Sequence, residues 1–564
     1  MKTGKSVFVL CAWLVAMVAG VYLSGMFVQM LIGVRAPLAF DTWWSYWQVI
    51  DTSRMQPYAG KVKLAGALGF GTPLLLWSGL LVLALKPAQR ALHGDARFAG
   101  KGDLARRGLF DEDEGRSIVV GRYGRRLLRF PGQQFVIIAA PTRSGKGVGI
   151  VIPNLLEYSD SVVVLDIKHE NFRLTSGWRA SQGQDVFLFN PFAENRRTHR
   201  WNPLSYVSRD PAFRVSDLQG IAAMLYPDGA DDQKFWVGQA RNAFLAFALY
   251  LFDNHDREIA CGLPEAHAAF PTLGRIHRLS TGDGNDLRAH LQSLAARPFT
   301  SAACRTAFAS LLSQANETFA SIIGTFKEPL NAWINPVLDA ATSGNDFWLT
   351  EVRRRRMTVY IGIQPDKLAE ARLILNLFFS QLISLNTREL PQDNAGLKHQ
   401  CLLLMDEFTS IGKVGIIASA AGYMAGYNLR LLPIIQSMSQ LDATYGKETA
   451  RTLITNHAMQ VIYAPRVQQD AEDYSQMLGY TTLRKRNRSR SQGAQGSVTV
   501  SEAEERRALM LPQELKAMAA DREVILCEGL THPVMAGKIR YYEDARFTRR
   551  LLPAVPVPTL DVMG

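Results

Sequence analysis

A lysine in a glycine-rich loop is the residue of this sequence that most clearly points to chemistry. An apolar run of β-strand type, residues 135–139, leads into the loop APTRSGKGVG at 140–149 and then into a helix-like stretch. In such a unit, loop N–H groups and the amino end of the helix hold phosphate oxygens, and the lysine reaches the β- and γ-phosphates. We therefore predict that Lys146 is catalytic, with further nucleotide contacts from Thr142, Arg143, Ser144, Gly145, Gly147 and Val148.

Two positions of this loop depart from the common phosphate-loop pattern G-x-x-x-x-G-K-[ST]. Ala140 stands where the first glycine is usual, and Gly147 stands where a hydroxyl usually ligates Mg²⁺. Without that hydroxyl, the cation must depend more on water, on the nucleotide and on a carboxylate elsewhere. From this segment alone, a glycine-rich turn with an incidental lysine stays open as the alternative.

Two adjacent acids far downstream supply such carboxylates. Asp406 and Glu407 follow the apolar run 400–405, so we expect them at the carboxyl end of a buried parallel strand. There Asp406 can hold Mg²⁺ through its water shell, and Glu407 can orient or deprotonate the attacking water. Capping of the next helix is the competing interpretation, because acids favour a first helical turn. The phosphate-binding loop upstream favours the catalytic interpretation.

Other short apolar runs must form the rest of the sheet that positions these groups. They cover residues 162–165, 186–189, 359–361 and 431–435, and each is nearly continuous, as in a sheet buried on both faces. Parallel strands bring their carboxyl ends to one edge, where open α/β sheets bind ligands. Gln436 follows the last run and is a catalytic candidate that could contact the γ-phosphate or its water, with an ordinary surface glutamine at a strand end as the alternative.

The long interval between Lys146 and Asp406 predicts an insertion. Over residues 208–346 the β-type runs vanish and helical periodicity takes over. We therefore expect an all-α domain there, inserted into a nucleotide-binding domain formed by residues 91–207 and 347–564.

Residues 1–90 are predicted to form a membrane anchor. The stretches 7–32 and 64–85 contain no charged residue, and each can cross a bilayer, which takes roughly 20 apolar residues. Basic residues precede the first stretch and follow the second, so the positive-inside rule places both termini and the main body in the cytoplasm, with a periplasmic loop between the spans. A cleaved signal peptide is the alternative for the first stretch, but its apolar run is long and a second span follows.

The composition of the whole chain limits the class of protein. Of the 564 residues, 47% are hydrophobic and 20% charged, which excludes a disordered polyelectrolyte and a collagen-like fibre. The net charge of +12 fits anionic partners such as nucleic acid or membrane lipids, or serves solubility alone. The basic run 484–496, rich in Ser and Gly, is expected to be a loop that grips phosphates or is merely exposed. Five scattered cysteines support neither a disulfide framework nor a zinc site.

These features together resemble the coupling proteins of bacterial type IV secretion, the TraG/VirD family of conjugative membrane ATPases. Glycine at position 147 is similar to what this family carries. The most specific segments are GDARF at 94–98, the loop at 140–149 with its continuation IVIPNL, LDIKHE at 165–170 and LMDEF at 404–408.

The resemblance implies an α/β fold: a RecA-like P-loop NTPase domain with an inserted all-α domain and an amino-terminal two-helix transmembrane hairpin. It implies an ATP hydrolase that uses Mg²⁺ and assembles as a homohexamer at the bacterial inner membrane. Its cargo would be relaxase-bound single-stranded DNA, protein effectors or both, passed to components of a type IV secretion channel. In such rings an arginine of the neighbouring subunit completes the site, and the candidates are Arg430 and Arg451.

Two other functions fit parts of the sequence. A nucleotide-gated docking scaffold with little hydrolysis is suggested by Gly147, which lacks the metal-binding hydroxyl. An FtsK-type DNA translocase would also combine an ATP-driven motor with a membrane anchor. Such pumps usually have more membrane spans and a long linker, and this sequence shows neither.

Overall fold

The chain forms two compact units, Met1–Leu92 and His93–Gly564. The structure is a computed structural model, and it describes residues 2–85, 92–111, 115–228, 231–282, 286–490 and 498–562.

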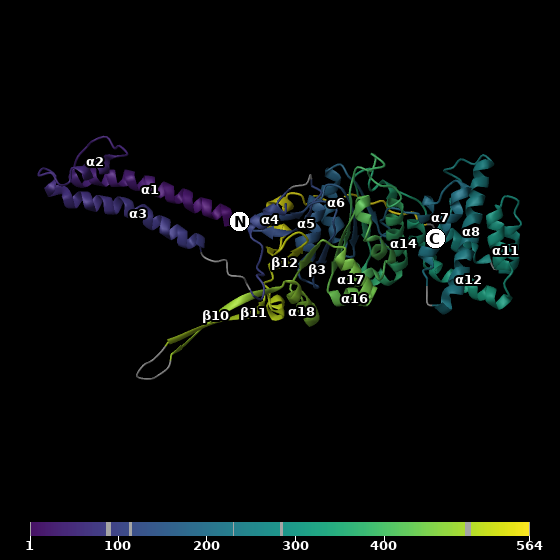
Figure 1. The fold of residues 1–564 in the computed structure, drawn as a ribbon. Coiled ribbons are helices and arrows are strands. Elements are labelled where there is room, and N and C mark those ends of the chain that lie inside the picture. The colour runs from purple at the N-terminus through teal and green to yellow at the C-terminus, as the bar shows by residue number, and fades with distance from the viewer. Residues whose placement is uncertain are drawn as a thin grey trace. The chain divides into compact units, whose positions relative to one another are not determined.

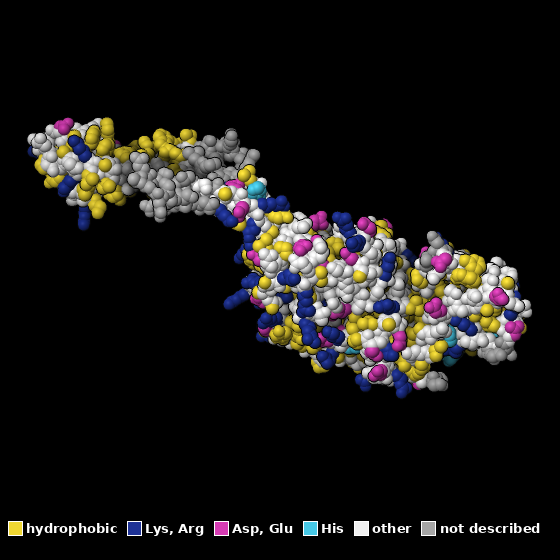
Figure 2. Space-filling view, turned by 90° about the horizontal axis from the view of Figure 1, so that it is seen from below, with side chains coloured by type: hydrophobic (Ala, Val, Ile, Leu, Met, Phe, Trp, Pro, Cys, Tyr) yellow, Lys and Arg dark blue, Asp and Glu magenta, His cyan; other side chains and the backbone are white. Residues whose placement is uncertain are grey.

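The first unit is a pair of long apolar helices. Helices α1 (Lys2–Ile32) and α3 (Ala59–Leu85) lie side by side (Figure 1). Segments Leu10–Ile32 and Gln56–Val82 are long and apolar enough to cross a membrane, by length and composition. Figure 2 shows many hydrophobic side chains on the coloured part of this unit. Met30, Leu75 and Leu76 are among its exposed residues. Exposed apolar side chains in such density are typical of a surface that faces lipid.

The short helix α2 (Thr42–Gln48) closes one end of this pair. The ring of Trp43 stacks on Trp47, with centroids 5.0 Å apart, and meets the ring of Phe70 edge-on. The indole N–H of Trp43 donates to the carbonyl of Val62. The aromatic residues between the two long helices therefore form a small core of their own.

The second unit is built on a mixed sheet with the strand order β2-β1-β13-β12-β9-β3-β8-β7-β4-β6-β5. Strands from β9 to β5 are parallel, and the other neighbours are antiparallel. The strands are β1 (Ile118–Tyr123), β2 (Arg126–Phe130), β3 (Val136–Ala139), β4 (Ser161–Asp166), β5 (Asp185–Phe189), β6 (Met357–Gly362), β7 (Cys401–Met405), β8 (Leu429–Ile435), β9 (Met459–Ile462), β12 (Arg522–Cys527) and β13 (Val534–Gly537).

Helices cover both faces of this sheet, which explains the continuous apolar runs of its central strands. Along β3, Val136 and Ile138 pack with residues of α5 (Ile152–Glu157) and α6 (Glu170–Ser181). The alternate residues of β3 pack on the opposite side, in a core shared with α14 (Leu368–Asn386) and α16 (Met438–Tyr445). Every residue of β3, β4, β6, β7 and β8 is buried. The predicted α/β class and the predicted strands in this part of the chain are confirmed.

Helix α14 is a third helix with the length and hydropathy of a membrane span. Its Phe378 stacks on Phe189 and meets Trp201 edge-on, and all three side chains are buried in the second unit. The apolar character of α14 therefore belongs to a core helix.

The segment between β5 and β6 is helical wherever the structure describes regular elements in it. Buried rings join these helices, with Phe247 stacked on Phe326 and edge-on to Phe308. The same core continues without a break into the sheet, so these helices belong to the same compact unit as the strands. They are α7 (Pro211–Leu225), α8 (Lys234–Ala260), α9 (Leu273–Leu279), α10 (Leu287–Ala295), α11 (Ala302–Leu312), α12 (Asn316–Leu330) and α13 (Pro336–Ala341) (Figure 1).

The prediction of a loop at 484–496 is wrong for residues 484–490. Strand β10 (Tyr480–Arg490) pairs antiparallel with β11 (Val498–Ala508) in a separate two-stranded sheet, and residues 491–497 lie outside the described residues. The basic strand faces an acidic one: Arg484 contacts Glu504 at 3.0 Å, and Lys485 contacts Glu505 at 2.6 Å. Cross-strand charge pairs of this kind stabilise a hairpin.

Candidate nucleotide-binding site

The glycine-rich loop joins the end of β3 to a π-helical segment, Gly147–Val151, that continues into α5. Gly145 has φ +89°, a left-handed conformation that only glycine adopts at little cost. The amide of Ser144 donates to the carbonyl of Pro141, and the amide of Gly149 donates to that of Gly145. The loop is thereby folded into a compact turn at the carboxyl edge of the sheet.

The structure brings the lysine and the two acids into direct contact. Nζ of Lys146 lies 3.1 Å from Oδ1 of Asp406 and 2.5 Å from Oε1 of Glu407. Both acids follow β7, which is separated from β3 by β8 alone, so the strand order itself places them opposite the loop. Only about a tenth of the lysine side chain and a fifth of each acid are exposed. These half-enclosed charges interact more strongly than surface pairs do.

Gln436, at the end of the intervening strand β8, connects the loop to the acids. Its amide nitrogen donates to Oε2 of Glu407 at 2.7 Å, and its amide oxygen accepts from the hydroxyl of Thr142 at 3.0 Å. The predicted Lys146, Asp406, Glu407, Gln436 and Thr142 therefore form one connected group.

The neighbouring acids of the site have opposite pKa shifts. Burial raises the pKa of Asp406, and the ammonium of Lys146 offsets only part of that effect. Burial acts on Glu407 in the same direction, but the hydrogen bond and charge of Lys146, with the hydrogen bond of Gln436, outweigh it and hold the pKa of Glu407 below its ordinary value. Glu407 is therefore the acid that stays ionised most readily in this arrangement.

Asp166, at the end of β4, is a further buried acid near this edge. Burial raises its pKa to about 6, and its Oδ2 accepts a hydrogen bond from the amide of Phe172 in α6. This carboxyl thus supports the start of a helix.

The residues present fit a nucleotide and its cation. The loop offers backbone N–H groups and an ammonium for phosphates, and the hydroxyl oxygen of Ser144 is buried with no hydrogen-bond partner among the described residues. Asp406 offers the oxygen ligands that Mg²⁺ prefers, which matters because Gly147 has no hydroxyl to give. On the loop itself, Arg143 is exposed and Val148 is half-buried.

The prediction that Arg430 completes a neighbouring site is wrong. Its side chain is fully buried, and its guanidinium donates to the backbone carbonyls of Gln134, Arg116 and Phe130 at 2.8 to 2.9 Å. It also stands near the amino end of β8, whereas the loop and acids lie at the carboxyl edge. A side chain held in this way cannot reach a nucleotide on another subunit.

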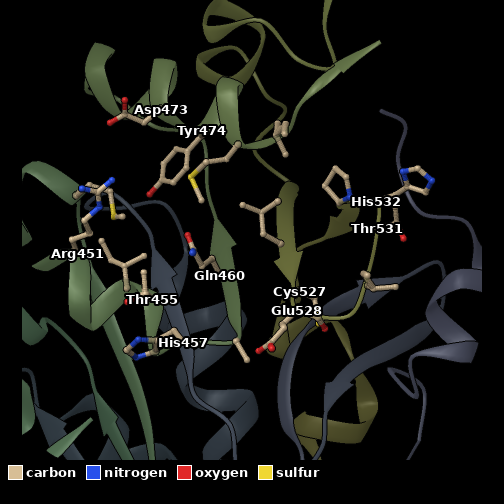
Figure 3. A pocket seen from close by; sticks show the side chains of 18 of the residues that line it. Arg451, Thr455, His457, Gln460, Asp473, Tyr474, Cys527, Glu528, Thr531 and His532 are labelled. Carbon is tan, nitrogen blue, oxygen red and sulfur yellow. The ribbon is translucent and has the colours of Figure 1, made fainter. Parts of the chain in front are cut away.

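Arg451 lies in α17 (Lys447–Thr455), where it is exposed and lines a cavity of about 1030 Å³ (Figure 3). His457, just before β9, and Glu528, just after β12, line the same cavity. Because β9 runs parallel to β3, its amino end lies at the edge opposite the phosphate loop. Arg451 is therefore away from the site of its own chain, and its role at a neighbour's site stays a prediction.

Two cations that contact the loop were missed from the sequence. Arg466 donates to the carbonyl of Thr142 at 3.0 Å, and Lys538 donates to that of Ser144 at 3.2 Å. They follow β9 and β13, strands of four residues that sequence analysis did not predict. No local signal marks these residues, because only the pairing of those strands brings them to the loop.

A family model and several curated proteins match this chain. The family model "Type IV secretory system Conjugative DNA transfer" matches residues 97–559. Protein VirD4 of Rhizobium rhizogenes is 30% identical over 503 residues, covering 86% of this chain and 71% of the relative. Protein VirD4 of Rhizobium radiobacter is 29% identical over 538 residues (93% and 74%). Conjugal transfer protein TraG of Escherichia coli is 27% identical over 586 residues (93% and 87%).

Solved structures show a similar fold. The bacterial conjugative coupling protein TrwBdeltaN70 matches with a TM-score of 0.58 at 18% identity, covering 84% of this chain and 97% of that chain. TrwB in complex with the non-hydrolysable ATP analogue ADPNP gives 0.57 at 18% identity (85% and 98%), and TrwB with ADP and Mg²⁺ gives 0.56 at 19% identity (80% and 95%). At this identity the likeness shows the fold alone, and it agrees with the RecA-like arrangement predicted above.

Proposed function

Because this chain belongs to the type IV secretory system conjugative DNA transfer family, we propose that it is an ATP hydrolase that recruits secretion substrates and couples them to a type IV secretion channel. Membership confirms the resemblance drawn from the loop and the acidic pair. The observation that carries the proposed activity is the contact of Lys146 with both Asp406 and Glu407. Complexes of TrwB with an ATP analogue and with ADP and Mg²⁺ support ATP and Mg²⁺ as its ligands here.

The residues of the site divide the work of hydrolysis between them. The loop N–H groups and Lys146 hold the phosphates, as at other helix amino ends. Asp406 would hold Mg²⁺, and the ion when bound would neutralise charge on the phosphates. Glu407 accepts a proton from the attacking water, for which its lowered pKa keeps it ionised. Gln436 orients Glu407 through the 2.7 Å hydrogen bond.

Nucleotide entry requires Lys146 to change partners. Its ammonium is shared between two carboxylates, so phosphate oxygens must replace at least one of them. Before the nucleotide binds, the two acids keep the side chain of Lys146 beside the loop. Less side-chain entropy of Lys146 is therefore lost when the nucleotide binds.

Replacing this lysine tests the proposal directly. Lys146→Ala should abolish ATP hydrolysis and cargo transfer while membrane insertion stays normal, because the ammonium that contacts the phosphates is gone. Hydrolysis is measured by phosphate release from the full chain in detergent, and transfer by mating or effector delivery. The exposed Lys101 offers a matched control, and Lys101→Ala should match the wild type. Normal hydrolysis by Lys146→Ala would refute the proposed activity.

Cargo, assembly and location belong to the same proposal. The chain acts at the bacterial inner membrane, with α1 and α3 as two spans, and the body on the cytoplasmic side receives relaxase-bound single-stranded DNA, protein effectors or both. The two candidate spans of the first unit support this arrangement. We also propose a homohexamer, and a division into an anchor (1–90), a RecA-like domain (91–207 with 347–564) and a helical insertion (208–346).

The alternatives receive less support. A family of conjugative DNA transfer proteins favours coupling to secretion over an FtsK-type translocase. An experiment can distinguish a docking scaffold from a hydrolase, because the scaffold needs to bind nucleotide but does not need to hydrolyse it.

A further inference from the structure

A buried lysine touches the phosphate-binding loop from behind. Lys538 follows β13, and its side chain is among the buried residues. Its Nζ donates to the carbonyl oxygen of Ser144 at 3.2 Å and lies 3.7 Å from the ring centroid of Tyr463. The backbone amide of Lys538 donates to the carbonyl of Asp521 at 2.8 Å, which fixes the segment that carries it. The backbone of Lys538 is thus fixed between the end of β13 and the start of β12, on the antiparallel side of the sheet.

The same segment also contacts the loop at a second point. A side-chain carbon at Gly149 would lie 2.9 Å from the hydroxyl oxygen of Tyr463 and 3.2 Å from the carbonyl oxygen of Ile539. Glycine is therefore the residue that fits at 149, pressed against Tyr463 and the residue after Lys538. Ser144 and Gly149 flank Lys146, so both sides of the catalytic lysine are supported from this direction.

A buried acid completes the cluster. Glu523 in β12 is fully buried. Burial raises its pKa well above the ordinary value, and the nearby charge of Lys538 offsets part of this. Glu523 therefore lies close to both Lys538 and Tyr463, the two residues that support the loop.

The contact with Ser144 has a geometric consequence for phosphate binding. In a trans peptide the C=O and the following N–H point in opposite directions. Holding the carbonyl of Ser144 toward Lys538 turns the N–H of Gly145 away from Lys538, to the opposite side of the loop. Gly145, with its left-handed φ, can accept either direction of that peptide. The contact of the Ser144 carbonyl with Lys538 therefore selects one of the two peptide directions.

We propose that Lys538 is a positioning residue of the nucleotide site, which holds the Ser144 carbonyl and thereby aims the loop N–H groups at the phosphates. This inference rests on the proposed function only in that the loop must bind a nucleotide. Lys538 touches no substrate in this role, and it acts through the backbone of the loop.

The test separates affinity from turnover in the full chain purified in detergent. Lys538→Met keeps the length of the side chain and removes the ammonium. We expect the Kd for a fluorescent non-hydrolysable ATP analogue and the KM for ATP each to rise about tenfold, with kcat within about twofold of wild type, because loop N–H groups bind ground and transition states alike. Lys538→Arg can still donate to Ser144, so it should restore both constants to within about threefold of wild type.

Two further variants keep the test decisive. If Lys538→Met unfolds because Glu523 loses its neighbour, the double variant Lys538→Met/Glu523→Gln removes the ionisable acid together with the ammonium and should fold with the same loss of affinity. Lys101→Met at the surface should behave as wild type. Wild-type affinity in the folded Lys538 variants, or a Lys538→Arg variant as weak as Lys538→Met, would overturn the positioning role. Wild-type protein that binds the analogue without hydrolysing ATP would overturn the proposed hydrolase alone, and absence of any binding would overturn both.

Discussion

At the residue scale, the two adjacent acids of the site are held in different ways. Both carboxyl oxygens of Glu407 are engaged, one by Lys146 and one by Gln436, whereas Asp406 contacts Lys146 through a single oxygen. Glu407 also has φ +59°, an uncommon value for a residue with a side chain. The different contacts of the two acids suit the proposed roles, with Glu407 as the base and Asp406 as the acid that holds the cation.

This difference predicts the behaviour of Glu407→Gln. The amide oxygen can still accept from Lys146, so affinity for an ATP analogue should stay within a few-fold of wild type. The base is lost, so kcat should fall by about 10²–10⁴. Binding is measured by fluorescence and turnover by phosphate release. Cargo transfer then decides between the two functions: a motor should lose it, whereas normal transfer without hydrolysis would establish the docking scaffold.

At the element scale, the parts of the site that could be predicted follow buried parallel strands. Continuous apolar runs marked β3, β7 and β8, and each is followed by a residue of the site. Strands β9 and β13 escaped prediction because they contain residues such as Gln460 and Gly537, which break an apolar pattern. Lys538 was missed with them. Its function depends on strand pairing, which no local run of residues reveals.

The β10–β11 hairpin was missed for a related reason. Its first strand alone is a basic run that favours a loop, and the matching acids come later in the chain. Glu504→Lys should place like charges opposite each other and accelerate amide hydrogen exchange in β10 several-fold, since exposed pairs contribute about 0.2–1 kcal/mol. The charge swap Arg484→Glu/Glu504→Lys should restore protection. Unchanged exchange in Glu504→Lys would show that the pair does not stabilise the hairpin.

At the scale of the whole molecule, three helices within the described residues have the length and hydropathy of membrane spans, and the burial of their side chains distinguishes them. Helix α14 packs inside the body, while α1 and α3 carry exposed apolar side chains. The predicted stretches 7–32 and 64–85 overlap the candidate spans Leu10–Ile32 and Gln56–Val82, because charged residues bound them. Helices α7 to α13 lie in the range where periodicity predicts helices, and the division into domains stays a prediction. The core that joins the insertion to the sheet escaped prediction, because periodicity identifies helices without showing what they pack against.

The proposed topology can be tested with single cysteines. In a background with the exposed Cys11 and Cys261 replaced by serine, Thr52→Cys lies between α1 and α3, and Ser181→Cys lies in the body. A membrane-impermeant maleimide should label Thr52→Cys in cells whose outer membrane is permeable, because the proposed topology places that loop in the periplasm. It should label Ser181→Cys only after the inner membrane is opened. The reverse pattern would contradict a cytoplasmic body.

The ion pairs of Lys146 also bear on which solutes the loop accepts. A bare anion such as sulfate or inorganic phosphate competes with two carboxylates for one ammonium, and it leaves both carboxylates without a counter-charge. A nucleotide that arrives complexed with a divalent ion satisfies the ammonium and the acids in a single event. The resting contacts should therefore favour a triphosphate that arrives with its metal ion over a small bare anion.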